Sequence, residues 1–270
     1  MNKYIATVFI AIILFSFSCT RVPITGRKQM NLMPESELMT MSLTEYNKFL
    51  SSHTTLPSSD PNTILVKKVG NNIKAAVEKF MNSNKKFKSR IAGYKWDFNV
   101  VDDNKTVNAW CMPGGKVVVY TGLLPITQNE TALAVVMGHE IAHAIARHGN
   151  ERMSQGVAVQ AGGAVLSTMV GTQSSATKDL FNQSYGAVSS LGVLAYSRKH
   201  ELEADKLGLV FMALAGYDPK EAIPFWQRMA NASKGGTLAI LSTHPSDEKR
   251  IAEIKAFIPK AMKYYRPNQQ

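Results

Sequence analysis

The pattern of apolar and polar positions predicts a chain built mainly of helices. Apolar residues recur at three- and four-residue intervals over 35–50 and again over 61–81, where Asp60 and Pro61 are typical of a helix start. Runs of β-branched and aromatic residues between turn signals predict two short strands, at 96–101 and 116–121. Helical spacing is found in four later stretches: 127–149, 199–216, the residues after Asp218, and 246–257. The pattern therefore predicts an α+β fold, mainly helical, with a small β-sheet.

The N-terminal residues are arranged like a secretory signal. Lys3 precedes an almost unbroken apolar run over 5–17, and small residues lead to Cys19. The run is too short for a comfortable membrane span, which needs about 20 residues. A cysteine directly after such a signal resembles the lipobox of bacterial lipoproteins, in which the cysteine carries the lipid. We therefore predict a signal peptide at 1–18, lipidation at Cys19, a lipid-anchored tether at 19–34 and a folded domain at 35–270. An ordinary secreted protein and an uncleaved anchor are the alternatives.

The composition changes this picture little. Hydrophobic residues make up 45% of the 270 and charged residues 19%, which leaves ample apolar material for a core. Lys and Arg outnumber Asp and Glu by 31 to 20, but the positive charges are scattered and no nucleic-acid-binding module is recognisable, so we expect no nucleic-acid partner. The densest basic run, 85–90, is predicted to be a solvated loop. The sequence has two cysteines, so a lipid on Cys19 would leave Cys111 without a disulfide partner.

The predicted helix at 127–149 carries the candidate chemistry. Thr127 and Glu130 are spaced as a capping box at its start, and Gly149 is typical of a helix end. His139 and His143 stand in its middle, in the order H-E-x-x-H. Histidines four residues apart lie on one face of a helix, one turn from each other. Their imidazoles can therefore reach the same metal ion.

Zinc suits this pair, because imidazole nitrogens bind it at about 2.0–2.1 Å. Glu140 is rotated by about 100° from His139, so it lies beside the metal and can act as a base on a water molecule. Without a metal, two unpaired histidines beside an apolar helix core would be costly. The spacing therefore favours a zinc site of the kind found in metalloproteases.

A catalytic zinc needs a third protein ligand and an open fourth position. The candidate segment is Glu201-Leu202-Glu203-Ala204-Asp205, on the predicted helix at 199–216. Glu201 and Asp205 share a face of this helix, whereas Glu203 points away. We therefore predict Glu201 as the third ligand and Asp205 as the acceptor of a hydrogen bond that fixes the tautomer of a ligand histidine. The alternative is a solvated acidic helix face.

Four segments together resemble the gluzincin family that contains HtpX, the Oma-type proteases and the CAAX prenyl protease. They are His139-Glu140-x-x-His143, the stretch 197–205, the stretch from Asn108-Ala109-Trp110 through Gly122-Leu123-Leu124, and Ser242-Thr243-His244-Pro245 followed by Arg250. The likeness covers about 23–254. It implies a zincin-like metalloprotease domain with the small sheet beside the active-site helix. The integral-membrane members have long apolar segments that this chain lacks after its N-terminus, so it resembles the soluble, lipoprotein-type members.

The resemblance also implies roles for single residues. These are zinc ligation by His139, His143 and Glu201, general base and proton donor for Glu140, and oxyanion stabilisation by His244 with support from Arg250. Asn108 and Ala109 would offer backbone hydrogen bonds to a substrate that lies as an extra strand. Taken alone, Thr-His-Pro is an ordinary capping turn, so the role of His244 depends on the resemblance. His148 and His200 receive no role and are predicted to lie at the surface or behind the site.

The sequence therefore predicts a zinc-dependent endopeptidase with one Zn²⁺ per chain, which hydrolyses unfolded or damaged proteins in the bacterial cell envelope. Its partners would be protein or peptide substrates and, through the N-terminal lipid, a membrane. No acidic sorting residue follows Cys19, which favours the periplasmic face of the outer membrane. One alternative is a lipid-anchored binding or assembly factor with a latent zinc-protease fold, and another is a zinc hydrolase with a non-peptide substrate. The segment 154–196 is predicted to cover the active-site cleft as packed helices or a lid.

Overall fold

The computed structural model describes residues 19–160, 175–185, 197–233, 238–244 and 248–267. A three-stranded sheet forms one layer, with the strand order β3 (Asp97–Val101), β5 (Lys116–Tyr120), β4 (Ala109–Met112). β3 and β5 are parallel, whereas β4 pairs with β5 in antiparallel register, Trp110 opposite Val118. β4 is therefore an edge strand. Both strands that the periodicity predicts are present.

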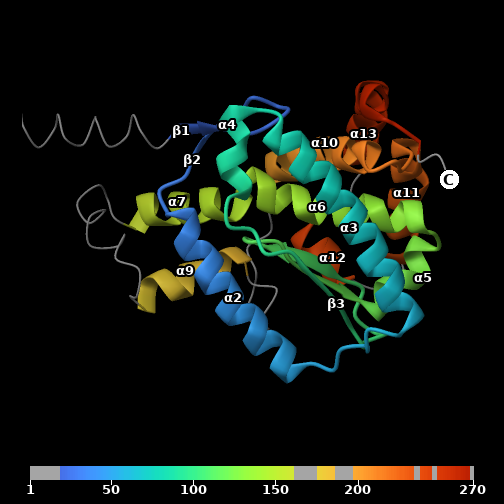
Figure 1. Cartoon of the computed structure of the whole chain (residues 1–270), viewed down its shortest axis with the longest axis horizontal. Helices are drawn as coiled ribbons and strands as arrows, with labels where there is room; N and C mark the ends of the chain where they lie inside the picture. Colours follow the sequence, from blue (N-terminus) through green and yellow to red (C-terminus); the bar gives the residue numbers. More distant parts are fainter. Residues whose placement is uncertain (1–18, 161–174, 186–196, 234–237, 245–247, 268–270) are drawn as a thin grey trace, which may run out of the picture.

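Two long helices, α6 (Glu130–Ala146) and α3 (Pro61–Asn82), cover this sheet, and a third, α10 (Arg198–Leu214), packs on these two helices. α6 runs through the middle of the molecule and packs against α10, α3 and strand β4 (Figure 1). α3 starts as predicted: Pro61 occupies the first turn, and the Asp60 side chain accepts a hydrogen bond from the Asn62 amide. The predicted fold, mainly helical with a small sheet beside the central helix, is confirmed.

The ends of α6 differ from the prediction. Asn129, not Thr127, caps its start by accepting a hydrogen bond from the Ala132 amide. The helix stops at Ala146, because Arg147 adopts a left-handed conformation (φ 59°) and a second helix begins at His148. Gly149 has a different use: a Cβ at this position would lie 2.1 Å from the Tyr185 ring. The glycine thus permits close packing and does not end the helix.

The remaining elements complete the layers around this centre. They are β1 (Cys19–Arg21), β2 (Lys28–Met30), α2 (Glu35–Ser52), α4 (Lys85–Lys88), η1 (Ser89–Ile91), η2 (Thr121–Leu123), α5 (Leu124–Thr127), α7 (His148–Gln160), α9 (Ser175–Tyr185), η3 (Pro219–Glu221), α11 (Ala222–Ala232), α12 (Ala239–Thr243), α13 (Glu248–Ala261) and η5 (Met262–Tyr264). None of the helices among the described residues is both long and apolar enough to cross a membrane.

The predicted tether at 19–34 is instead folded onto the domain. β1 and β2 pair as an antiparallel hairpin. Val22 is completely buried in the main core, and Gln29 and Met33 are buried as well. Because buried apolar surface stabilises the folded chain, this hairpin belongs to the domain and does not link it loosely to an anchor. The predicted signal peptide at 1–18 lies outside the described residues.

The segment predicted to cover the cleft is described in part. α7 and α9 pack together with α2 through a second apolar cluster: Met33, Leu38, Met153, Val157, Leu180, Phe181 and Tyr185. Residues 161–174 and 186–196 of this segment lie outside the described part of the chain. The described portion therefore consists of packed helices, and the lid remains a hypothesis.

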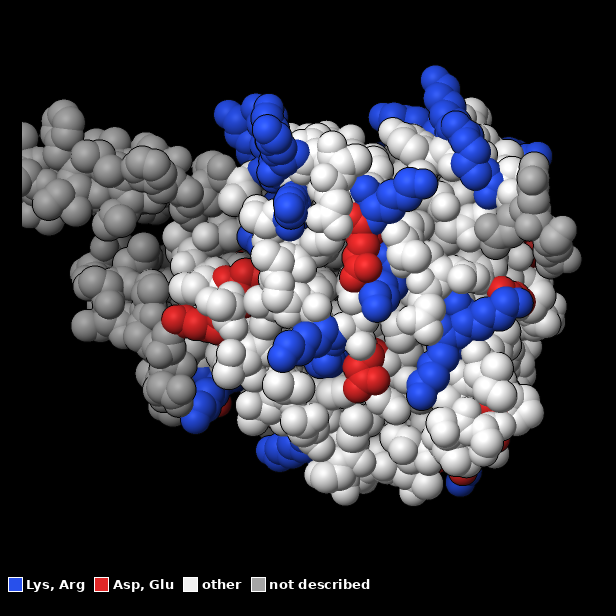
Figure 2. Space-filling model, viewed as in Figure 1, with Lys and Arg blue, Asp and Glu red and all other residues white. Residues whose placement is uncertain are grey.

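The basic run at 85–90 is a short helix and not a loop. Lys85, Lys86 and Lys88 are exposed on α4, in agreement with a solvated face. Arg90 is buried, however, and donates hydrogen bonds to the backbone carbonyls of Ile145 and Arg21. Figure 2 shows Lys and Arg in several separate groups on one face of the molecule, which agrees with the scattered charge of the sequence.

Candidate active site

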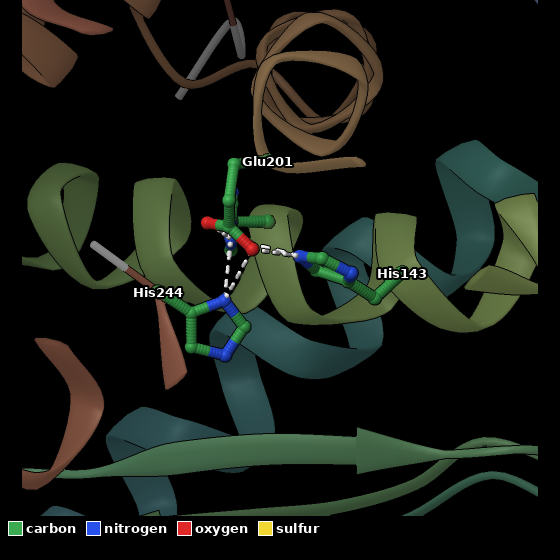
Figure 3. A group of neighbouring side chains, drawn as sticks. His143, Glu201 and His244 are labelled. Carbon is green, nitrogen blue, oxygen red and sulfur yellow. Dashed lines mark hydrogen bonds and ion pairs between the residues drawn. The ribbon is translucent and has the colours of Figure 1, made fainter. Parts of the chain in front are cut away.

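Two histidines from α6 and one glutamate from α10 converge at the centre of the molecule. The Nε2 atoms of His139 and His143 lie 3.1 Å apart. Each of them lies 3.4 Å from an oxygen of Glu201, Oε2 for His139 and Oε1 for His143. All three side chains are buried. Figure 3 shows Glu201 reaching down from α10 towards the ring of His143.

These separations fit a zinc ion. Donor atoms at about 2.0–2.1 Å from a tetrahedral zinc are about 3.3–3.4 Å from each other. The electrostatics agree with a cation here. Burial alone would lower the pKa of His139, but hydrogen bonds with Asp205 and Glu201 raise it to about 9, so the carboxylates favour a positive charge at this place. The nitrogen and oxygen donors present are those that zinc takes in catalytic sites.

His244, at the end of α12, brings a fourth donor atom to the same point. Its Nδ1 lies 3.3 Å from Nε2 of His139 and 3.0 Å from Oε1 of Glu201. The donor atoms of His139, His143, Glu201 and His244 all lie within 4.8 Å of one another. Figure 3 shows the last three of these residues facing one another. Sequence reasoning assigned His244 a different task, because a histidine 43 residues beyond Glu201 in a Thr-His-Pro turn has no spacing that marks it as a donor.

Glu140 lies next to this group, as the 100° rotation from His139 predicts. Its Oε1 is 3.7 Å from Nε2 of His244. This oxygen is buried and accepts no hydrogen bond from the described residues. Burial raises the pKa of Glu140. A carboxylate in this condition has a free lone pair and an increased affinity for a proton.

Asp205 holds the far side of the His139 ring. Its Oδ1 is 2.9 Å from Nδ1 of His139. Arg250 binds both oxygens of Asp205 at 2.8 Å, and its guanidinium lies 3.7 Å from the centre of the Trp226 ring. A further Arg250 nitrogen lies 3.2 Å from Glu201. The structure therefore places Asp205 where the sequence predicts it, and places Arg250 where it fixes two carboxylates.

His143 is held by residues to which the sequence assigned no role. Its Nδ1 lies 3.0 Å from Nδ1 of His148, and Nε2 of His148 lies 3.0 Å from Glu203. Burial lowers the pKa of His148 to about 4, so its ring is neutral. His200 lies behind, 3.1 Å from Glu151. The five-residue spacing from His143 to His148 gave no signal, because the break at Arg147 turns the chain between them.

The predicted substrate strand is the edge strand β4. The Tyr120 amide donates to the carbonyl of Asn108, so this carbonyl faces β5 and is not free for a substrate. In an antiparallel ladder the next residue points the other way, which leaves Ala109 on the outer edge. The amide of Ala109 is bonded to the side chain of Asn108, and the carbonyl of Val107 accepts from Ile240 at 3.0 Å. In this conformation α12 therefore borders the edge of β4.

Comparison with known proteins identifies the family that this chain resembles. The family model described as Peptidase family M48 matches residues 68–258. The mitochondrial metalloendopeptidase OMA1 of Schizosaccharomyces pombe is 35% identical over 89% of this chain and 66% of its own length. OMA1 of Saccharomyces cerevisiae is 31% identical over 98% of this chain and 76% of its length. The beta-barrel assembly-enhancing protease of Escherichia coli is 29% identical over 57% of this chain and 32% of its length.

These relatives correct one prediction. The proteins that match over most of the chain are named as mitochondrial, so the predicted location in a bacterial cell envelope, at the periplasmic face of the outer membrane, is wrong. The physical reason is that an apolar run behind a basic residue indicates a membrane but does not identify which one. The chain spans about two thirds of the fission yeast protein and about half of the human one (66% and 48%).

Proposed function

We propose, from the premise that this chain belongs to peptidase family M48, that it cleaves peptide bonds in unfolded or damaged proteins at one zinc ion held by His139, His143 and Glu201. The observation that carries the proposal is the spacing of the two Nε2 atoms, 3.1 Å from each other and each 3.4 Å from a Glu201 oxygen, which matches a tetrahedral zinc site.

Membership of the family confirms three predictions from the sequence: the family itself, the class of enzyme, a metalloendopeptidase, and zinc as its cofactor. We propose the roles of single residues and the choice of substrate.

Zinc bound at this site would polarise the scissile carbonyl and lower the pKa of a water molecule. Glu140 then takes one proton from the attacking water as the water oxygen bonds to the carbonyl carbon. Glu140 passes this proton to the amide nitrogen as the carbon–nitrogen bond breaks, which leaves a carboxylic acid and an amine. The raised pKa of the buried carboxyl suits the first step, because it strengthens Glu140 as a base.

The edge strand β4 is the proposed substrate site. An extended peptide that pairs with an exposed strand edge satisfies its own backbone hydrogen bonds, so only an unfolded or flexible segment can bind in this way. The backbone of Ala109 points away from β5 and would provide the contact once the side chains that bury this edge move aside. This geometry favours unfolded protein chains over folded ones as substrates.

His244 is the proposed gate of the site. A catalytic zinc keeps one position open, whereas the four donors here form a closed set. We infer that His244 leaves this position when substrate binds. The oxyanion role suggested by the resemblance stays a prediction, since in this conformation the ring faces the ligands.

Membrane attachment through the N-terminus is the remaining proposal. The apolar run at 5–17 and Cys19 provide two possible anchors. Membrane fractionation of Cys19→Ala and of a chain lacking 1–18 separates them. Loss of membrane binding in both variants supports a lipid on Cys19; retention in Cys19→Ala supports the apolar run.

The experiment that tests the function compares the purified full chain with Glu140→Gln. Bound zinc is measured, and cleavage of an unfolded protein is followed alongside a non-peptide ester. We expect about one zinc in both forms and a loss of peptide cleavage by roughly 10²–10⁴-fold in the variant. Glu78→Gln, on α3, is the control and should cleave normally.

Other outcomes overturn the proposal. Zinc binding without cleavage in the wild type supports a binding factor with a latent protease fold. Cleavage of the ester alone supports a hydrolase with a non-peptide substrate. Absence of zinc from the wild type contradicts the metal site itself.

A further inference from the structure

The two proposed histidine ligands are held from behind in different ways. The His139 ring contacts a carboxylate directly, at 2.9 Å from Asp205. The His143 ring contacts a second imidazole, that of His148, at 3.0 Å. A carboxylate behind a ligand histidine fixes its orientation and raises its basicity. For His148 to orient His143 and raise its basicity in the same way, His148 must itself be bonded to a further group.

The tautomers along this second chain follow from the metal site. If Nε2 of His143 faces the metal, its Nδ1 carries the hydrogen and donates it to Nδ1 of His148. His148 then carries its own hydrogen on Nε2, which lies 3.0 Å from Oε2 of Glu203. The donors thus all point in one direction, from His143 towards the Glu203 carboxylate. Glu203, which helical spacing predicted to point away from the site, is the end of this chain.

Glu203 is in turn fixed by the N-terminal hairpin. Arg27, in the loop between β1 and β2, approaches Oε2 of Glu203 with Nε at 2.7 Å and with a second nitrogen at 2.6 Å. Thr25 from the same loop donates to the other oxygen of Glu203. Arg27 also binds both oxygens of Glu151 at 2.7 Å. The guanidinium therefore ties together two carboxylates, and Glu203 is the one that contacts His148.

The loop that presents Arg27 is closed by backbone hydrogen bonds at Val22. Val22 donates to the Arg27 carbonyl at 2.8 Å and accepts from the Gly26 amide at 3.0 Å. Ile24 and Gly26 both adopt positive φ, 67° and 70°. Because Val22 is completely buried, the loop is held in the core at one end and at Glu203 at the other.

We propose that Arg27 is a positioning residue for the metal site and acts on His143 through Glu203 and His148. The N-terminal hairpin thereby becomes part of the catalytic centre, although it lies outside the matched region 68–258. The inference rests on the proposed function, because it needs His143 as a zinc ligand. It predicts that changes at Arg27 alter zinc binding at His143, to which Glu203 and His148 connect it.

The test measures zinc affinity of the full chain by competition with a chelator, and thermal stability with and without zinc. Arg27→Gln removes the charge, and Lys28→Gln, which changes an exposed basic residue on the same hairpin, is the matched control. His148→Leu breaks the chain, whereas His148→Gln offers an amide oxygen to His143 and an amide N–H to Glu203. Outer contacts of this kind typically change metal affinity by about 10–100-fold.

We expect Arg27→Gln and His148→Leu to weaken zinc binding by about 10–100-fold, while Lys28→Gln and His148→Gln stay close to the wild type. The double variant Arg27→Gln/His148→Leu should bind zinc no more weakly than His148→Leu, because both changes break one chain. Unchanged zinc affinity in a less stable Arg27→Gln would mean that the arginine only holds the hairpin, and would overturn the proposal.

The two His148 variants keep the test valid if Arg27→Gln does not fold. Equal zinc affinity in His148→Leu and His148→Gln contradicts the chain of hydrogen bonds. A wild-type protein that binds no zinc contradicts the proposed function instead, so the two failures are distinguishable.

Discussion

Gly138 of α6 and Gly208 of α10 lie against each other where the two helices cross. A Cβ on Gly208 would come within 2.9 Å of both the carbonyl carbon of Gly138 and the amide nitrogen of His139. A Cβ on Gly138 would lie 3.0 Å from the carbonyl oxygen of Gly208. The backbones can therefore approach only because both residues lack a side chain. Asp205, one turn before Gly208, reaches His139 as a result of this contact.

A methyl group at the crossing should consequently damage the site. We expect Gly208→Ala to lower the free energy of unfolding by about 1–3 kcal/mol, because the methyl has to displace backbone. Zinc binding should weaken at the same time, since α10 carries Glu201. Denaturant unfolding and zinc titration measure both effects. Gly156→Ala is the control: among the described residues its Cβ would meet only the end of the Leu180 side chain, at 3.1 Å, so zinc binding should be unaffected. Normal stability and zinc affinity in Gly208→Ala would contradict this account.

The contact of Asp205 with Arg250 leads to a second prediction. Asp205→Asn keeps the shape but removes the charge that faces a buried guanidinium, so we expect a stability loss of about 3 kcal/mol. Zinc affinity should fall by roughly tenfold, because the amide is a weaker acceptor for His139. Unfolding and chelator competition test these values, with the exposed Asp102→Asn as the control. A loss of stability without a change in zinc affinity would assign Asp205 to folding alone.

Regular spacing explains which parts of the site the sequence could predict. His139, His143, Glu201 and Asp205 act from two helices, and the four-residue repeat by itself places each pair on one face of its helix. The strands and the start of α3 were predictable for the same reason, since periodicity and capping are local properties.

Contacts between distant segments explain what the sequence could not predict. Arg27 meets Glu203 across 176 positions, and no pattern along the chain connects them. The end of α6 depends on Arg147, a residue type that rarely adopts positive φ, so Gly149 was the natural choice for the helix end. The hairpin at 19–34 was predicted to be a tether, because its burial comes from residues far away in the sequence.

A variant of His244 separates its two proposed roles, the gate of the fourth metal position and the stabiliser of the oxyanion. We expect His244→Ala to retain zinc, since three ligands remain, and to cleave an unfolded protein faster than the wild type. The reason is that the alanine leaves the fourth position open to water. A retained zinc with slower cleavage would instead support the oxyanion role. Initial rates at saturating zinc decide between them, and Ser242→Ala on the exposed end of α12 controls for disturbance of this helix.

The ion pair of Arg27 with Glu151 should make stability depend on pH. Burial alone would raise the pKa of Glu151, but hydrogen bonds from His200 and Arg27 lower it below the usual value of 4.5. The folded state thus favours the charged form. Its contribution is fully present above pH 4.5 and is lost as the pH falls towards the lower pKa of the folded protein.

The zinc-free protein should therefore lose stability on acidification below pH 4.5, more steeply than Glu151→Gln. At pH 7 we expect this variant to be less stable by about 3 kcal/mol, because the buried pair loses one partner. The two curves should converge at low pH, where Glu151 is protonated. Urea unfolding over a pH series measures this, with Glu253→Gln as the control: its pair with Lys206, 3.7 Å apart at the surface, should contribute less than about 1 kcal/mol. Parallel curves for Glu151→Gln and the wild type would show that the Glu151 carboxylate does not titrate with folding, and would contradict this prediction.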